Sequence, residues 1–373
     1  MNNTPKTSLK HILTAVFIAL FASVSFTAFA EETEHATEQA TEAKTEKKFD
    51  AGKLILEHIG DSHDWHILGE GHSSVSLPLP VIAYSNRGFA CFLSNKFEHG
   101  HKTYGGYKLE ENHLVAVNEM GEVDAHEATV NEEATKSIID ISITKNVATL
   151  LFSASLLLWA FLSVAGAYKK NPNKAPKGLQ SFVEPLIIFI RDEVAKPSIG
   201  AKYEKFVPYL LTVFFLILIN NLLGLVPVIP GGANLSGNIA FTMVLALITF
   251  VITTVNGTKH YWHHVFAMPG VPKPVLLILT PIEILGVFLK PFVLMIRLFA
   301  NMTAGHIIAL SFFAMIFIFG EMSTGAGLGV SVVSVAFTVF MGLLELLVAF
   351  LQAYVFTLLS AMYFGSALEE GHH

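Results

Sequence analysis

Long uncharged apolar segments dominate the chain from residue 147 onward and limit what it can fold into. Residues 147–168 contain no charge, and comparable segments cover 206–229 and 239–255. About 20 apolar residues in helical form cross the ~30 Å hydrocarbon core of a bilayer. The charged share of the whole chain is 14%, against ~25% in typical soluble domains. The sequence therefore predicts an all-α, polytopic membrane protein.

Two further apolar helices are expected at the end of the chain. The first is predicted to begin at Thr280, where Pro281 suits the first helical position and Glu283 completes a capping box. After a turn over 321–327, the last helix is predicted over 328–368, without a proline. At ~1.5 Å per residue it would be about 60 Å long, twice the hydrocarbon thickness. Because tilts of ~20° do not absorb that excess, we expect a strongly inclined helical hairpin.

The distribution of basic residues predicts the orientation of these five crossings. Four lysines closely follow the first segment, whereas the loop 230–237 has no Lys or Arg. By the positive-inside rule the lysine-rich loop is cytoplasmic. Residues 178–203 mix apolar and charged side chains, which is typical of an amphipathic helix on the cytoplasmic face. We therefore expect a bacterial inner-membrane protein with a periplasmic mature N-terminus and a cytoplasmic C-terminus.

The front of the chain is polar and resembles an exported segment. Lys6 and Lys10 precede an uncharged run, and Ala28-Phe29-Ala30 fits a signal-peptide cleavage site; an uncleaved first span is the alternative. The stretch that follows is nearly free of apolar residues and is predicted to be disordered. The predicted parts are a signal peptide, a disordered acidic tether, a His-rich outer segment and a membrane domain, over residues 1–30, 31–49, 50–140 and 141–373.

The outer segment is expected to contain some β-structure. Short strands with glycines between them are predicted over 75–84, 89–97 and 107–117. Eight of the 16 histidines lie between His58 and His126. Imidazoles bind zinc or copper readily, but exposed, solvated histidines are the more ordinary interpretation. No metal site is assigned.

Composition and motifs exclude several function classes. A net charge of −6 without a basic tract argues against nucleic acid as a partner. The only cysteine, Cys91, excludes an internal disulfide, a Cys-x-x-Cys metal site and a c-type haem attachment. Neither G-x-x-x-x-G-K-S/T nor G-x-G-x-x-G occurs, so the chain has no recognisable nucleotide-binding motif. We expect no cofactor.

Charged residues inside the last two apolar helices are the strongest functional signal. A charge at the bilayer centre costs from ~2.5–3.5 to more than ~10 kcal/mol and marks function by default. Glu283 suits a helix cap and Lys290 suits snorkelling to the interface, whereas Arg297 lies deep in an apolar stretch. The four intramembrane charges are Glu283, Lys290, Arg297 and Glu345, and loops are expected to hold Lys259, Lys273 and Glu321.

The predicted hairpin places polar residues of both helices at matching depths. With a turn centred near 324–326, Arg297 lies level with Gln352, and His306 lies level with Glu345. Asn301 stands one helical turn from Arg297. Titratable groups at the mouth, water-holding amides and a fixed cation at the end are what a proton path requires. Interhelical polar contacts, worth about 1 kcal/mol each, are the alternative, but they do not explain Arg, His and Glu together.

Several motifs are similar to those of one known family. They are Arg297-Leu-Phe-Ala-Asn301, Glu345 to Phe356, Pro281-Ile-Glu283, Lys290-Pro291, and a stretch over 220–227 that begins with Asn220 and Asn221. On these motifs, residues 140–370 resemble subunit a of the bacterial F-type ATP synthase. The family carries an acid and a histidine facing each other across the hairpin. The resemblance implies that His306 and Glu345 are this pair, with the two helices exchanged.

The resemblance implies a non-catalytic stator subunit with two proton half-channels. Its proton-translocating residues would be Arg297, Glu345, His306, Asn301, Gln352 and Glu283, with Lys290, Asn220 and Asn221 in support. Its partners would be rotor-ring subunits, peripheral-stalk subunits and the soluble ATPase head, within membrane lipid. Two alternatives are an ion antiporter, which should show internally repeated halves, and a passive membrane anchor or assembly subunit.

Overall fold

The computed structural model describes residues 51–68, 75–110, 112–170, 175–226 and 232–369. The predicted signal peptide and tether lie outside these residues. Five helices of the described part are long and apolar enough to cross a membrane, which confirms the predicted number of spans. They are α4 (Lys145–Lys170), α7 (Val207–Leu225), α8 (Ile239–Asn256), α10 (Lys273–Met322) and α11 (Thr324–Leu368).

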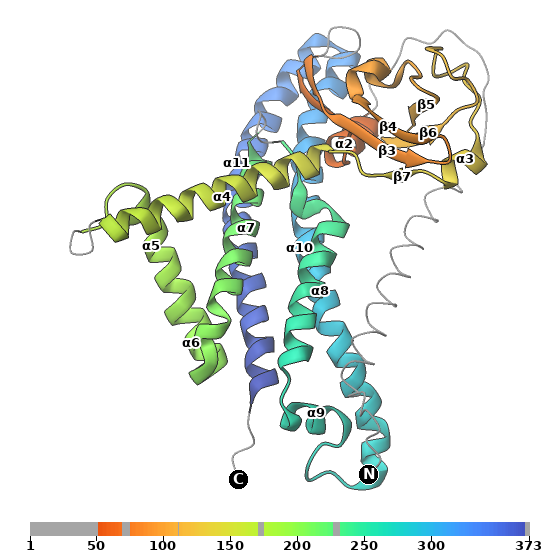
Figure 1. Ribbon diagram of the computed structural model, residues 1–373. Helices are drawn as coiled ribbons and strands as arrows, with labels where there is room; N and C mark the ends of the chain where they lie inside the picture. Colours follow the sequence, from red (N-terminus) through yellow and green to blue (C-terminus); the bar gives the residue numbers. More distant parts are fainter. Residues whose placement is uncertain (1–50, 69–74, 111, 171–174, 227–231, 370–373) are drawn as a thin grey trace.

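The last two helices form the long hairpin that the sequence predicts. α10 has 50 residues and α11 has 45, which corresponds to about 75 and 67 Å. They lie side by side, and the C-terminal part of α11 also packs on α7 (Figure 1). Phe214 of α7 and Phe356 and Phe364 of α11 are fully buried in this contact. α8 packs against α10 on the other side, and α4 crosses α7 obliquely (Figure 1).

The first helix of the hairpin begins earlier than predicted. α10 starts at Lys273, which was expected in a loop, so the start at Thr280 is wrong. The Thr280 hydroxyl donates to the Phe266 carbonyl at 3.2 Å instead of capping a helix. Proline does occupy the first turn, as predicted, but at Pro274, while Pro281 lies inside the helix. Membrane helices tolerate such prolines because neighbouring groups satisfy the freed carbonyls.

The turn of the hairpin is also shorter than predicted. Glu321 lies in the last turn of α10 rather than in a loop, and Ser323 alone separates the helices. The Ser323 hydroxyl accepts a hydrogen bond from the Ala326 N–H at 3.1 Å. Serine is a favoured N-cap, so α11 begins at Thr324 instead of residue 328. The loop between α8 and α10, in which Lys259 was predicted to lie, contains the short helix α9 (Lys259–Phe266).

The amphipathic segment predicted over 178–203 is helical and is not one of the five spans. It consists of α5 (Leu179–Phe189), the π-helical turn η4 (Ile190–Ala195), α6 (Lys196–Ile199) and the 3-10 segment η5 (Gly200–Lys205). Its buried side chains, Ile190, Val194 and Ala195 among them, pack on α7 and α11. Its charged residues Arg191 and Asp192 stay exposed and pair at 2.8 Å.

The described residues 51–140 form a small head of short elements. Its helices are α2 (Ala51–Ile59), η3 (Ser94–Gly100) and α3 (Glu132–Lys136). Its strands pair antiparallel as β1–β2, β4–β3–β7 and β5–β6. Their bounds are Asp64–Leu68 for β1, Val75–Pro78 for β2, Pro80–Ser85 for β3, Gly88–Leu93 for β4, Tyr107–Glu110 for β5, His113–Ala116 for β6 and Ile139–Asp140 for β7.

Each strand predicted in the head is shorter than expected. The run 75–84 is divided at Leu79 into β2 and β3, and residues 94–97 belong to η3 rather than to a strand. The run 107–117 contains two strands, β5 and β6, that pair with each other. Asn112, with a φ of 66°, supplies the left-handed conformation that this tight turn requires.

Hydrogen bonds join the head to the start of α4. The Asp61 carboxylate accepts from the Thr144 hydroxyl at 2.8 Å and from the Asn146 N–H at 3.0 Å, so it caps the helix. His63 lies 3.1 Å from Asp140 and is only 4% exposed, so the interpretation as solvated histidines is wrong for His63. Burial raises the pKa of Asp140, but hydrogen bonds from His63 and Ser142 outweigh it and lower the pKa to about 2.

Candidate functional site

Arg297 lies on α10 with its side chain exposed on an otherwise apolar surface. The ion pairs within the described part of the chain all involve other residues. A guanidinium inside a membrane span is costly to leave without a counter-charge. The position therefore fits a cation whose partner comes from outside the described residues.

The polar residues predicted to accompany Arg297 lie along the α10–α11 contact. The Asn301 Nδ2 donates to the Gln352 Oε1 at 3.0 Å. Gln352 is 4% exposed, so its amide points into the protein interior. The amide pair stands one helical turn from Arg297, towards the turn of the hairpin.

The next turn brings Glu345 against the residue before His306. A Cβ placed on Gly305 would lie 2.5 Å from the Glu345 Oε1 and 3.2 Å from its Cγ. The carboxylate thus lies directly over Gly305, in space that only glycine leaves open. His306 turns towards α7, where a Cβ placed on Gly224 would lie 3.7 Å from its Nε2.

Asparagines of α7 extend this polar group away from α10. Asn220 and Asn221 are each 1% exposed. The Asn221 Nδ2 donates to the Ala349 carbonyl of α11 at 3.2 Å, and the Asn220 Nδ2 donates to the Leu216 carbonyl at 2.7 Å. Neither Oδ1 atom has a hydrogen-bond partner among the described residues.

Two residues near His306 were not predicted from the sequence. Asn234 and Ser236 lie at η6 (Leu235–Gly237), which packs against α7 and α10. Asn234 Cα stands 4.0 Å from the Cβ position of Gly224, the glycine beside His306. The buried Asn234 Nδ2 and Ser236 Oγ also lack partners among the described residues. Nothing local distinguishes these residues from ordinary loop residues, so only the packing reveals them.

Glu283 and Lys290 lie towards the other end of α10. α9 packs against α10, and burial together with the negative charge of Glu283 raises the pKa of Tyr261 in α9 to about 12. The Lys290 Nζ lies 5.8 Å from the centre of the Tyr363 ring. The structure therefore separates these two charges from the group around Glu345 and His306.

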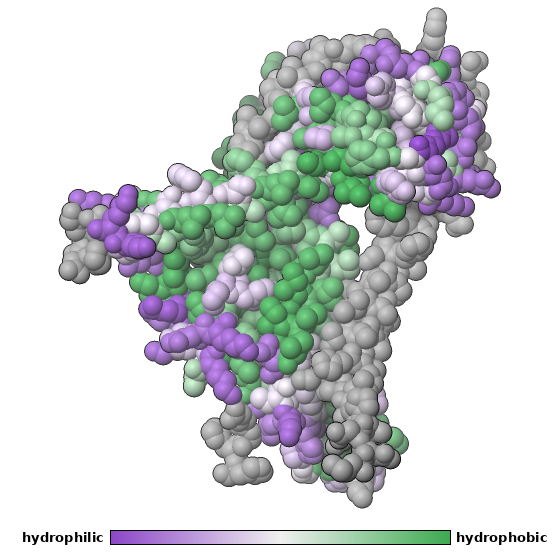
Figure 2. All heavy atoms as spheres, in the orientation of Figure 1, coloured by the Kyte–Doolittle hydropathy of each residue, from purple (hydrophilic) through white to green (hydrophobic). Residues whose placement is uncertain are grey.

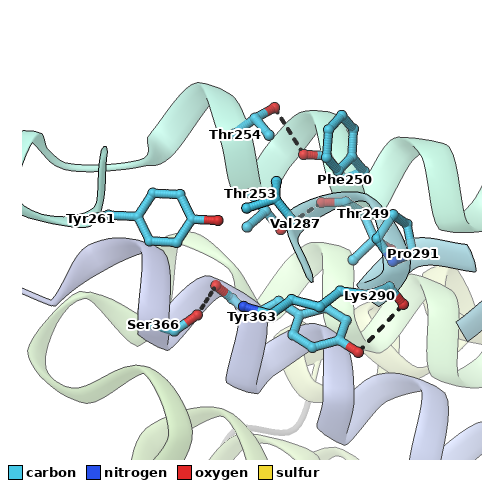
Figure 3. Close-up of a pocket in the computed structure, with 10 residues that line it drawn as sticks. All are labelled: Thr249, Phe250, Thr253, Thr254, Tyr261, Val287, Lys290, Pro291, Tyr363 and Ser366. Atoms are coloured by element: carbon cyan, nitrogen blue, oxygen red, sulfur yellow. Dashed lines mark hydrogen bonds between the residues drawn. The ribbon is translucent and has the colours of Figure 1, made fainter. Parts of the chain in front are cut away.

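A narrow pocket adjoins Lys290, between α8, α9, α10 and α11 (Figure 3). Hydroxyl-bearing side chains from three of these helices line it, and Lys290 and Tyr363 stand side by side at one wall (Figure 3). Its lining residues are Thr249, Phe250, Thr253, Thr254, Tyr261, Val287, Lys290, Pro291, Tyr363 and Ser366.

Comparisons with known proteins agree on the membrane part of the chain. Residues 147–365, more than half of the chain, match the family described as ATP synthase A chain. Residues 54–141 match a family described as a domain of unknown function. The head and the membrane part therefore match different families.

Curated relatives match the chain at high identity. ATP synthase subunit a 2 of Chlorobaculum tepidum is 52% identical over 235 residues, which cover 61% of this chain and 64% of that protein. Subunit a 2 of Prosthecochloris aestuarii is 43% identical over 285 residues, which cover 74% and 83%. Subunit a of Myxococcus xanthus is 44% identical over 242 residues, which cover 63% and 76%. The similarity thus spans less than two thirds of the Chlorobaculum protein.

Proposed function

The chain belongs to the ATP synthase A chain family, and on that premise we propose that it is the stator proton-channel subunit of a rotary F-type ATP synthase. The observation that carries the proposal is Arg297, an exposed guanidinium on an apolar helix with no ion-pair partner in the described chain. A rotor-ring carboxylate is a counter-charge of the right sign. The further partners are the peripheral-stalk subunits and the soluble ATPase head, which carries the nucleotide chemistry.

The outer half-channel runs through the group around Glu345 and His306. Four buried polar atoms, on Asn220, Asn221, Asn234 and Ser236, have no partner in the described chain. Buried polar groups of this kind are normally satisfied by ordered water. Water there would connect the two titratable groups, and the Asn301–Gln352 amides would lead on towards Arg297.

Arg297 would act on each rotor carboxyl as the ring turns. The guanidinium favours the ionised carboxylate, so the carboxyl releases its proton on arrival. Because arginine keeps its charge at any physiological pH, it also prevents a proton from passing directly between the half-channels. Each charge moved through ~100 mV contributes ~2.3 kcal/mol towards rotation.

The inner half-channel would lie at the opposite end of α10. Glu283 stands beside α9, and Lys290 borders the hydroxyl-lined pocket. Hydroxyl groups can relay protons through bound water. We therefore assign the inner path to the cytoplasmic side, with the head and the mature N-terminus periplasmic and the C-terminus cytoplasmic.

ATP-driven acidification of inverted membrane vesicles tests the proposal. We expect Arg297→Ala to abolish acidification while the complex still assembles and its ATPase head still hydrolyses ATP. Arg191→Ala is the matched control, since Arg191 is an exposed arginine outside the spans. Acidification that survives Arg297→Ala would refute the proton role and leave a passive anchor, and assembly without a rotor ring would favour an antiporter.

A further inference from the structure

The three-stranded sheet of the head has one buried face and one exposed face. In antiparallel pairs, directly opposed residues point to the same side. Val81 pairs with Phe92 and Ala83 pairs with Ala90, and these residues belong to the head core. The opposite face, named the outer sheet face below, consists of Ile82, Tyr84, Phe89, Cys91, Leu93 and Ile139.

The outer sheet face is apolar and largely uncovered. Phe89 is 69% exposed, Ile139 is 58% and Tyr84 is 56%. Ile141, whose N–H donates to the Ile82 carbonyl, follows Ile139 by two residues and is 63% exposed. None of these residues carries a charge. Contiguous apolar surface of this kind marks an interaction site.

The position of the outer sheet face relative to α4 indicates what covers it. Ile141 precedes Lys145, the first residue of α4, by four positions, so their Cα atoms are at most about 14 Å apart. The Asp61 cap and the contact of α2 with α10 hold the head against the spans. The face therefore cannot move far from the bilayer surface that α4 enters.

The apolar surface of the spans continues onto the head. Exposed apolar residues run along α4, including Leu151, Leu158 and Trp159. Figure 2 shows this surface extending over the lower edge of the head, at β3 and β7, while hydrophilic residues gather along the top and right edges of the head in this view. Aromatic residues such as Tyr84 and Phe89 are common at the bilayer interface.

We propose that the outer sheet face is a membrane-contacting surface that lies in the interfacial layer of the outer leaflet. The occupant is lipid, because the face continues the lipid-facing surface of α4 and carries no charge to match a polar partner. The head then lies against the bilayer surface instead of projecting away from it. This placement does not depend on the proton path.

The native cysteine allows a direct test without changing the face. Cys91 is the only cysteine of the chain and is exposed in the middle of the face. A nitroxide spin label on Cys91, in the whole complex reconstituted in liposomes, would report collisions with oxygen, which concentrates in lipid, and with a water-soluble nickel chelate. We expect frequent oxygen collisions and few nickel collisions.

A label at an exposed, charged position elsewhere in the head is the control. Cys91→Ser combined with Glu127→Cys places the label on an exposed polar site, where we expect the reverse preference. Frequent nickel collisions at Cys91 would overturn the proposal, since the face would then be in water. A label that is immobile and shielded from both reagents would also overturn it, in favour of a protein partner or a second copy.

Discussion

Asn301 and Gln352 join α10 to α11 through one hydrogen bond, in which the Asn301 Nδ2 donates to the Gln352 Oε1 at 3.0 Å. From the sequence, Gln352 was predicted to lie level with Arg297 instead. Bonding to Asn301 leaves the Arg297 guanidinium available to an external carboxylate.

Removing the Gln352 amide should therefore impair proton transfer more than stability. Gln352→Leu keeps the volume but leaves the Asn301 amide unpaired, at a cost of about 1 kcal/mol. We expect assembled complexes with strongly reduced acidification of inverted vesicles. Gln180→Leu, in α5 outside the spans, should leave acidification unchanged. Equal acidification in both variants would contradict a role of Gln352 in the path.

Gly305 should be required because it makes room for Glu345. A Cβ at this position would lie 2.5 Å from the carboxylate oxygen, so Gly305→Ala should displace Glu345 and reduce proton pumping. Gly329→Ala is the control, because a Cβ there meets nothing within 4 Å.

Shortening the acid tests whether crowding is the cause. Glu345→Asp in the Gly305→Ala background should restore part of the pumping, because the shorter side chain removes the 2.5 Å contact of the carboxylate oxygen and leaves only the looser 3.2 Å contact of Cγ. Failure of the double variant to exceed Gly305→Ala would mean that the alanine acts in another way.

The Asp61 cap should control how firmly the head is attached. Asp61→Ala leaves the Thr144 hydroxyl and the Asn146 N–H without their acceptor, which should cost about 1 kcal/mol locally. We expect faster hydrogen exchange at the Asn146 amide, with Glu132→Ala in the exposed helix α3 as control. An unchanged hydrogen-exchange rate at the Asn146 amide would show that other contacts hold the head against α4.

The Asp140–His63 pair should make the head sensitive to acid. The folded-state pKa of Asp140, about 2, lies below its ordinary value of 3.8. A lowered carboxyl pKa contributes stability that is present above pH 3.8 and is lost as the pH falls towards 2. Because Asp140 is 34% exposed, solvent reduces the size of the effect.

Denaturant unfolding between pH 5 and 2 measures this contribution. The fluorescence of the buried Trp65 reports on the head when Trp159→Phe and Trp262→Phe remove the other tryptophans. In that background we expect Asp140→Asn to flatten the pH dependence of unfolding. If the free energy of unfolding of the Asp140→Asn variant still falls as steeply with decreasing pH, other carboxyl groups cause the acid sensitivity.

Much of the membrane fold could be predicted because the thickness of the hydrocarbon core fixes how many apolar residues a spanning helix needs. Any apolar run near 20 residues must cross, and a proline-free stretch such as 328–368 must form an inclined helix. The same physics singles out Arg297 and Glu345, because a charge within a membrane span is too costly to be incidental. These conclusions need no knowledge of which helices are neighbours.

The helix starts and the details of the site could not be predicted from the lengths of apolar segments. Thr280 and Pro281 satisfy the local rules for a helix start, as does Pro274, and only the packing of α9 against α10 decides between them. In the head, the alternation over 107–117 does not reveal the left-handed turn at Asn112. Local sequence patterns show which helix starts and turns are possible, whereas tertiary contacts determine which of them forms.

The sequence by itself determined the number of spans, the long hairpin and the identity of the charges within its helices, because each follows from the transfer of side chains out of water. Only the tertiary structure decided that Gly305 receives Glu345, that Gln352 bonds Asn301, and that one face of the head sheet stays apolar and open. Those outcomes depend on how each helix or strand is rotated against its neighbours. That rotation is set by packing throughout the molecule rather than by any single segment.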